Sequence, residues 1–184
     1  EQRIIDSIGR LSELPVFIDD TPFQTLVEMR SKSRRLSLET GLDLLIVDYL
    51  QLIQGKGRGD NRVQEIGEIS RSLKGMARDL GVALLTCSQL SRAVEGRTGH
   101  RPQLSDLRDS GSIEQDADVV MFIHREDRDY TVEEWDQQFP GKIYPKNIAE
   151  IIVAKHRNGP TGNLQLFFRD NFVRFDSYHQ VDEF

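Results

Sequence analysis

Three short and almost wholly apolar runs, at 44–47, 82–87 and 119–123, constrain the fold of this 184-residue chain most strongly. Runs of this kind are typical of strands that are buried on both faces. Stretches with the spacing of amphipathic helices lie among them. Because parallel strands need long connections, usually helices, the alternation predicts an α/β fold with a parallel sheet flanked by helices.

A helix is predicted ahead of the first apolar run. In "DTPF", Asp20 or Thr21 can act as the N-cap and Pro22 can occupy a first helical position, so the helix should run from there to about Glu39. Before it, the β-rich run "PVFID" at 15–19 predicts a further short strand.

A longer helix is predicted over 61–80. Asn61 and Gln64 have the spacing of a capping box, and Gly81 follows as a C-terminal cap. One face of this helix should be buried, because apolar residues recur along it at helical intervals. They are Val63, Ile66, Ile69, Leu73, Met76 and Leu80.

The style of the sequence changes from Ile148 onward. "AEIIVAKHRNGPTGNLQLFFRDNFVRFD" contains two or three strand-like runs separated by the turn signals "RNGPTG" and "DN", with no helical stretch between them. This predicts an antiparallel hairpin at the edge of the sheet. The segment 125–147 is expected to be a surface excursion between strands.

Composition limits the remaining possibilities. A chain of 184 residues is long enough for one domain with a sizeable core, and its apolar runs are far too short to span a membrane. Cys87 is the single cysteine, so no disulfide is expected and a reducing cytoplasm is the natural location. The net charge of −6 argues against coating nucleic acid by bulk electrostatics but leaves room for a local basic site.

Polar side chains follow two of the predicted parallel strands. Asp48 ends the run "LLIVD", and Ser88 and Gln89 follow "VALLTC". Ligands of such sheets bind beyond the carboxyl ends of the strands. Asp48 is therefore either the N-cap of the turn that follows it or a ligand-binding carboxylate. The second polar strand end favours the latter, because a carboxylate for magnesium beside an amide that senses a phosphate is typical of P-loop ATPases.

Several motifs carry a resemblance to a known family. "LLIVDYLQLI", "SQLSR", "LSDLRDSGSIEQDADVVMFIHR" and "KHRNGPTG" occur in this order and at these separations. They resemble the C-terminal motor domain of the DnaB family of replicative DNA helicases, which are RecA-like P-loop ATPases. The resemblance extends from about Leu14 to Phe175. It implies a RecA-like core, ATP and magnesium as cofactors, and a ring of six copies that moves along single-stranded DNA, with a primase and a helicase loader as partners.

The resemblance also implies roles for individual residues. Asp48 matches the Walker B aspartate that positions magnesium, and Gln89 matches the glutamine of the sensing motif. Arg157 matches the arginine finger that reaches the γ-phosphate of a neighbouring subunit, with Lys155 as its companion. A turn that is stiffened by Pro160 suits a finger. The alternative for Arg157 is a solvated hairpin tip that keeps a sheet edge soluble.

A DNA-binding loop is implied by Arg108, Asp109 and Gly111, although the family often has Glu where this chain has Asp109. Independently of the resemblance, arginines and glycines alternate over 91–111, and such a loop can grip phosphates without reading bases. The alternative is an ordinary surface loop. The histidines at 100, 124, 156 and 179 do not have the spacing of metal ligands.

The phosphate-binding motif G-x-x-x-x-G-K-[ST] does not occur in the chain, and "GKGRGDN" at 55–61 does not replace it. Residues 1–184 are therefore interpreted as a single partial domain, the C-terminal portion of a helicase motor without its Walker A part. Two other hypotheses remain open at this point. One is a RecA-like ATPase with a different role, such as a recombinase. The other is a non-catalytic remnant that serves as an interaction module.

Overall fold

The computed structural model describes residues 2–55, 62–97 and 99–178, with the side chains of 108–110 outside that description. The predictions for Asn61 and for most of "GKGRGDN" fall outside it. Within the described ranges, no helix is both long enough and apolar enough to cross a bilayer.

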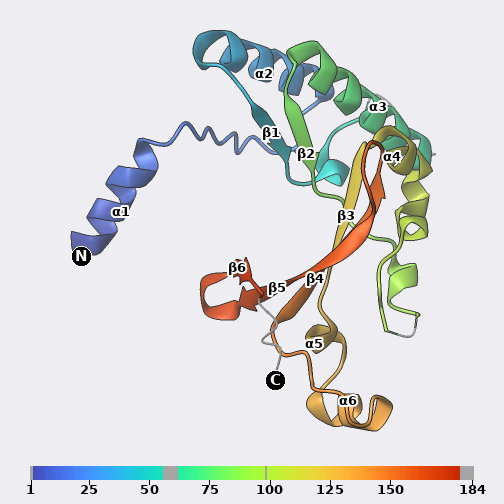
Figure 1. Ribbon diagram of the computed structural model, residues 1–184. Helices are drawn as coiled ribbons and strands as arrows, with labels where there is room; N and C mark the ends of the chain where they lie inside the picture. The colour runs from blue at the N-terminus through green and yellow to red at the C-terminus, as the bar shows by residue number, and fades with distance from the viewer. Residues whose placement is uncertain (1, 56–61, 98, 179–184) are drawn as a thin grey trace.

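The strands form two sheets (Figure 1). In the first, β1 (Leu44–Val47) pairs in parallel with β2 (Ala83–Thr86), in a register that places Val47 opposite Thr86. In the second, β3 (Val119–His124), β4 (Ile148–His156), β5 (Gly162–Arg169) and β6 (Arg174–Ser177) are antiparallel neighbours in chain order. The predicted parallel strands and the predicted antiparallel edge are therefore both present.

One expected pairing differs from the prediction. β3 was expected to extend the parallel sheet, but its hydrogen-bonded partner is β4, with Val119 opposite His156. In the described ranges no strand links β2 to β3. Apolar runs reveal that a segment is a buried strand, but the same residues can pair with any neighbour, so the choice depends on tertiary packing.

The segment 15–19 is not a strand. Its backbone is irregular, and Val16, Phe17 and Ile18 are all exposed. Ahead of it, α1 (Gln2–Ser12) buries none of its residues and stands apart from the rest of the molecule (Figure 1). A β-rich run becomes a strand only beside a partner, and the described residues supply none here.

The helix before β1 starts later than predicted. α2 (Leu26–Thr40) has Thr25 as its N-cap, and Thr25 forms a capping box with Glu28. Asp20 and Thr21 are not the cap. Instead, the Asp19 carboxylate accepts hydrogen bonds from the Thr21 amide and hydroxyl, which closes a local turn. The C-terminus of α2 agrees with the prediction to within one residue.

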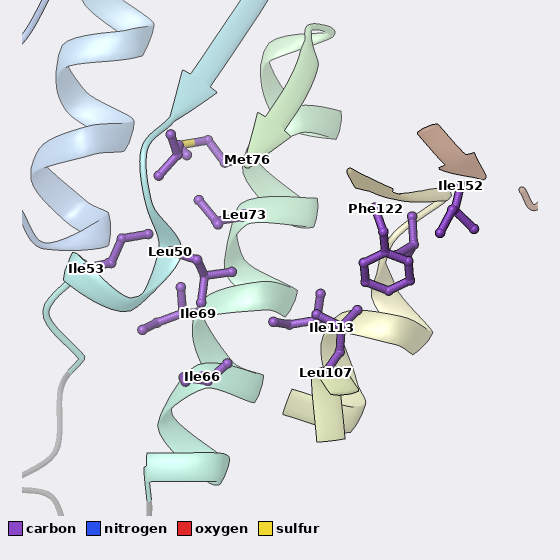
Figure 2. Close-up of a cluster of buried hydrophobic side chains, with 12 residues drawn as sticks. Leu50, Ile53, Ile66, Ile69, Leu73, Met76, Leu107, Ile113, Phe122 and Ile152 are labelled. Atoms are coloured by element: carbon purple, nitrogen blue, oxygen red, sulfur yellow. The ribbon is translucent and has the colours of Figure 1, made fainter. Parts of the chain in front are cut away.

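The long helix α3 (Arg62–Leu80) follows the prediction closely. Four of its six stripe residues are buried, namely Ile66, Ile69, Leu73 and Met76. They meet Leu50 and Ile53 on one side and Leu107, Ile113 and Phe122 on the other (Figure 2). Gly81 ends the helix with a φ of 67°, which glycine adopts without strain. α3 therefore joins the two sheets through one core.

The remaining short elements lie on the chain between the strands. η1 (Leu50–Leu52) follows β1, while η2 (Arg92–Val94), η3 (Leu104–Ser110) and α4 (Gly111–Asp116) lie between β2 and β3. α5 (Glu126–Asp129) and α6 (Val132–Gln138) form the predicted excursion, which packs its rings around the buried Trp135. η4 (Asp170–Phe172) connects β5 to β6.

Candidate functional site

The parallel pairing of β1 and β2 brings the two polar strand ends together. The Cys87 amide donates a hydrogen bond to the Val47 carbonyl at 3.0 Å, and the Leu50 amide donates one to the Cys87 carbonyl at 3.0 Å. Asp48 and Gln89 therefore follow neighbouring strands at the same edge of the sheet, as the sequence predicted. Both residues are exposed.

Gln51 ties these strand ends together, and the sequence analysis did not single it out. Its Nε2 donates to the Ser88 hydroxyl at 3.0 Å, and its Oε1 accepts from the Gln89 amide at 3.3 Å. The backbone at Gln89 is thereby held next to the turn that follows β1. A polar residue inside the apolar run "YLQLI" is the signal that could have identified it.

Asp48 is not a helix cap. The turn after β1 begins at Leu50, and its N-cap is Tyr49, without a side-chain hydrogen bond. Among the described residues, none donates a hydrogen bond to the Asp48 carboxylate or forms an ion pair with it. An exposed carboxylate without a protein partner can bind a magnesium ion that retains its waters and takes its other ligands from phosphates.

A cavity of about 1070 Å³ lies between the segment 15–24, α2 and β1. Its lining includes Asp48 but neither Gln89 nor Arg157. The cavity therefore does not unite the candidate residues.

Arg157 and Lys155 lie at the end of β4, beside α4. The Arg157 Nη2 donates to the Gln115 carbonyl at 3.0 Å, and Nη1 lies 3.4 Å from the Asp118 carboxylate. The Lys155 ammonium donates to the carbonyls of Glu114, Gln115 and Ala117. In the described part of the chain, neither side chain contacts Asp48 or Gln89.

Asp118 connects this region to α3. Its carboxylate forms a hydrogen bond with the Lys74 ammonium, and its carbonyl accepts from the Arg157 amide at 2.8 Å. The hydrogen bond from Lys74, together with the nearby charge of Arg157, lowers the pKa of the Asp118 carboxyl below its usual value. A negative charge therefore lies beside the Arg157 guanidinium at neutral pH.

Two arginines of the loop 91–111 are bonded within the chain. Arg97 binds the buried Asp106 carboxylate through both Nη atoms, at 2.9 and 2.7 Å. This contact, with the Gln103 amide adding a further hydrogen bond, lowers the pKa of Asp106. Arg101 pairs with Glu150 of β4. Arg97 and Arg101 are thus occupied by carboxylates, and the interpretation of both as phosphate-gripping residues is wrong for this state.

The loop residues that the resemblance identified are described only in part. The side chains of Arg108 and Asp109 lie outside the described part of the structure. Gly111 is exposed and forms the first residue of α4, directly after them.

The histidines form no metal centre within the described residues. His100 and the buried His124 approach opposite oxygens of Asp129, at 3.1 and 3.7 Å. His156 accepts or donates toward the Pro160 carbonyl, according to its tautomer. No group of three or more potential ligands capable of holding a metal ion occurs in the described ranges; His179 lies beyond them.

Comparison with known proteins identifies similar sequences along nearly the whole chain. A family model described as the DnaB-like helicase C terminal domain matches residues 1–177. Replicative DNA helicase DnaB of Geobacillus stearothermophilus is 50% identical over 170 residues, which are 92% of this chain and 35% of that protein. Replicative DNA helicase DnaC of Bacillus subtilis is 51% identical over the same shares. The chain thus spans about a third of the length of these relatives.

Solved structures resemble the fold equally well. One solved helicase-type ATPase domain has a TM-score of 0.85 and 38% identity, covering 97% of this chain and 60% of that one. A DnaB-like replicative helicase, solved to show its interactions with primase, has a TM-score of 0.84 and 38% identity, with 97% and 41% coverage. The predicted α/β architecture of RecA-like type is confirmed by these similarities.

Proposed function

The chain belongs to the DnaB-like helicase C-terminal domain family, and on this basis we propose that it is the C-terminal portion of a replicative DNA helicase motor. In this proposal the full-length protein uses ATP to unwind duplex DNA at the replication fork. The observation that carries it is the match of the family model to residues 1–177, together with about 50% identity to replicative helicases. A different RecA-like ATPase or a non-catalytic module is supported by no specific contact.

Asp48 is the proposed magnesium-binding residue and Gln89 the proposed phosphate sensor. The donor set fits this assignment, since magnesium in ATPases is usually held by one or two carboxylates together with phosphate oxygens and water. A bound magnesium ion would neutralise charge on the phosphates. Gln51 fixes the backbone at Gln89 and so keeps that amide beside Asp48.

Arg157 is the proposed arginine finger, with Lys155 as its companion. The described contacts within one chain support action across a subunit boundary, because Arg157 lies beside α4 and does not meet Asp48. Its side chain is 44% exposed and is therefore accessible to a neighbour. A head-to-tail ring would supply each ATP site with the finger of the next subunit. We propose a homo-hexamer for this reason and from the family.

The proposed polymer ligand is single-stranded DNA, contacted by Arg108, Asp109 and Gly111. A primase and a helicase loader are the proposed protein partners. The primase is supported by the similar DnaB-like helicase that was solved for its interactions with primase. A cytoplasmic location follows from the same proposal.

The test is complementation in mixed rings of the full-length protein. Arg157→Ala should retain ATP binding and lose hydrolysis, because its own site is intact but its neighbour's site lacks a finger. Asp48→Asn should lose hydrolysis because its amide cannot match the carboxylate's charge beside the ion. Mixed in equal amounts, about one interface in four would join an intact site to an intact finger, and ATPase activity should return.

Activity that stays absent in stable mixed hexamers would contradict the trans role of Arg157. Wild-type activity of Asp48→Asn alone would contradict the proposed metal-binding role. The matched control is Arg174→Ala, because Arg174 pairs only with Asp176 on β6, at the far edge of the antiparallel sheet. This variant should hydrolyse ATP normally by itself.

A further inference from the structure

Lys155 binds the C-terminal end of α4. The last carbonyls of a helix have no partner within the helix and need an external donor. An ammonium has three N–H donors, and here it is directed at the carbonyls of Glu114, Gln115 and Ala117, the last two at 3.4 and 2.8 Å. Positive charge at this end also complements the helix dipole. Lys155 therefore acts as a cap of α4 in this structure.

Arg157 reinforces the same contact. Its guanidinium donates to the Gln115 carbonyl, and its backbone amide donates to the Asp118 carbonyl just after the helix. Figure 1 shows the end of β4 beside α4. Both residues that are proposed to reach a neighbour's γ-phosphate are thus bound to the end of one short helix.

The opposite end of α4 begins at Gly111, the last residue of the proposed DNA-binding set. The helix packs closely on α3 at this end, since a Cβ atom at Gly67 would lie 2.7 Å from the Ser112 hydroxyl. Ile113 is buried in the core. With only six residues, α4 has no length over which a displacement of its C-terminal end could be absorbed before it reaches Gly111.

We infer that Lys155 is a positioning residue for the DNA loop, and that it alternates between the carbonyl end of α4 and the γ-phosphate of the neighbouring subunit. This inference rests on the proposed function and adds a regulation to it. Phosphate oxygens are stronger acceptors for a cation than neutral carbonyls. Binding of ATP next door would therefore draw Lys155 and Arg157 away from α4 and release the foot of the loop, while loss of phosphate would restore the cap.

The first experiment uses the chain itself and requires neither DNA nor ATP. Amide hydrogen exchange within α4 reports its stability, for instance at Ala117, whose amide bonds to the Ile113 carbonyl. Lys155→Met should raise exchange there by about tenfold, as expected for loss of hydrogen bonds from a charged donor. Lys155→Arg should restore most of the protection. Lys146→Met is the control, because Lys146 is exposed and its side chain contacts none of the described residues.

The second experiment measures single-stranded DNA binding by the full-length hexamer, with and without a non-hydrolysable ATP analogue. Without nucleotide, Lys155→Met should bind a fluorescent oligonucleotide about tenfold more weakly than wild type, and the analogue should change its affinity much less. Lys146→Met should behave as wild type. A residue that contacts only phosphate would leave the nucleotide-free affinity unchanged.

The outcomes separate this inference from the proposed function. Unchanged exchange in α4, or unchanged nucleotide-free DNA affinity in a folded Lys155→Met hexamer, overturns the positioning role and leaves the helicase assignment intact. A wild-type hexamer that binds no DNA overturns both, even if the exchange experiment shows the cap. A fall in thermal stability equal to that of the whole fold, with exchange raised everywhere, would also overturn the specific link between Lys155 and α4.

Discussion

At the scale of the residue, Asp106 holds a negative charge inside the loop between β2 and α4. Its side chain is 1% exposed, whereas that of its partner Arg97 is 32% exposed. The carboxylate also accepts from the Gln103 amide, so it organises both ends of the turn before η3. Removing one member of a buried pair leaves the other uncompensated, which costs more free energy than the pair itself contributes.

We therefore expect Asp106→Asn to lower the free energy of unfolding by about 2–3 kcal/mol at pH 7, measured by urea denaturation. Because the pKa of Asp106 is lowered in the folded state, its contribution is present above the unfolded pKa, about 4, and is lost as pH falls through the folded pKa. The difference between wild type and variant should shrink below about pH 4. The exposed Asp20→Asn is the control; an equal loss there would contradict the prediction.

At the scale of the element, the start of α2 depends on the partner that each threonine finds. Thr25 accepts from the Glu28 amide and Glu28 bonds back to Thr25, whereas Thr21 is engaged by Asp19. We expect Thr25→Ala to destabilise the chain by about 1 kcal/mol and Thr21→Ala by clearly less, in thermal or urea denaturation. A larger loss for Thr21→Ala would place the functional cap where the sequence alone suggested it.

Strands were less predictable than helices for a physical reason. The stripe on α3 is encoded within one segment, so periodicity found the helix and most of its buried residues. The runs at 15–19 and 119–123 are equally strand-like in sequence. Only the latter became a strand, because β4 lies beside it.

At the scale of the whole molecule, the chain carries the proposed catalytic residues without the motif that cradles phosphates. The isolated chain should therefore show no measurable ATP hydrolysis, with or without single-stranded DNA, since neither backbone amides nor a lysine of such a motif can hold the β- and γ-phosphates. Single-turnover assays of phosphate release would test this. Turnover that is stimulated by DNA would contradict the expectation and reveal another phosphate site in this chain.

The sequence by itself determined the α/β class, the long helix α3, the antiparallel edge, and the adjacency of Asp48 and Gln89, because each depends on local periodicity or on the geometry shared by parallel strands. The tertiary structure decided which strand β3 pairs with, and how the charges of Arg97 and Lys155 are used. Lys155 meets Glu114 across 41 residues of sequence. Contacts at such separations depend on how the elements pack, and no local pattern records them.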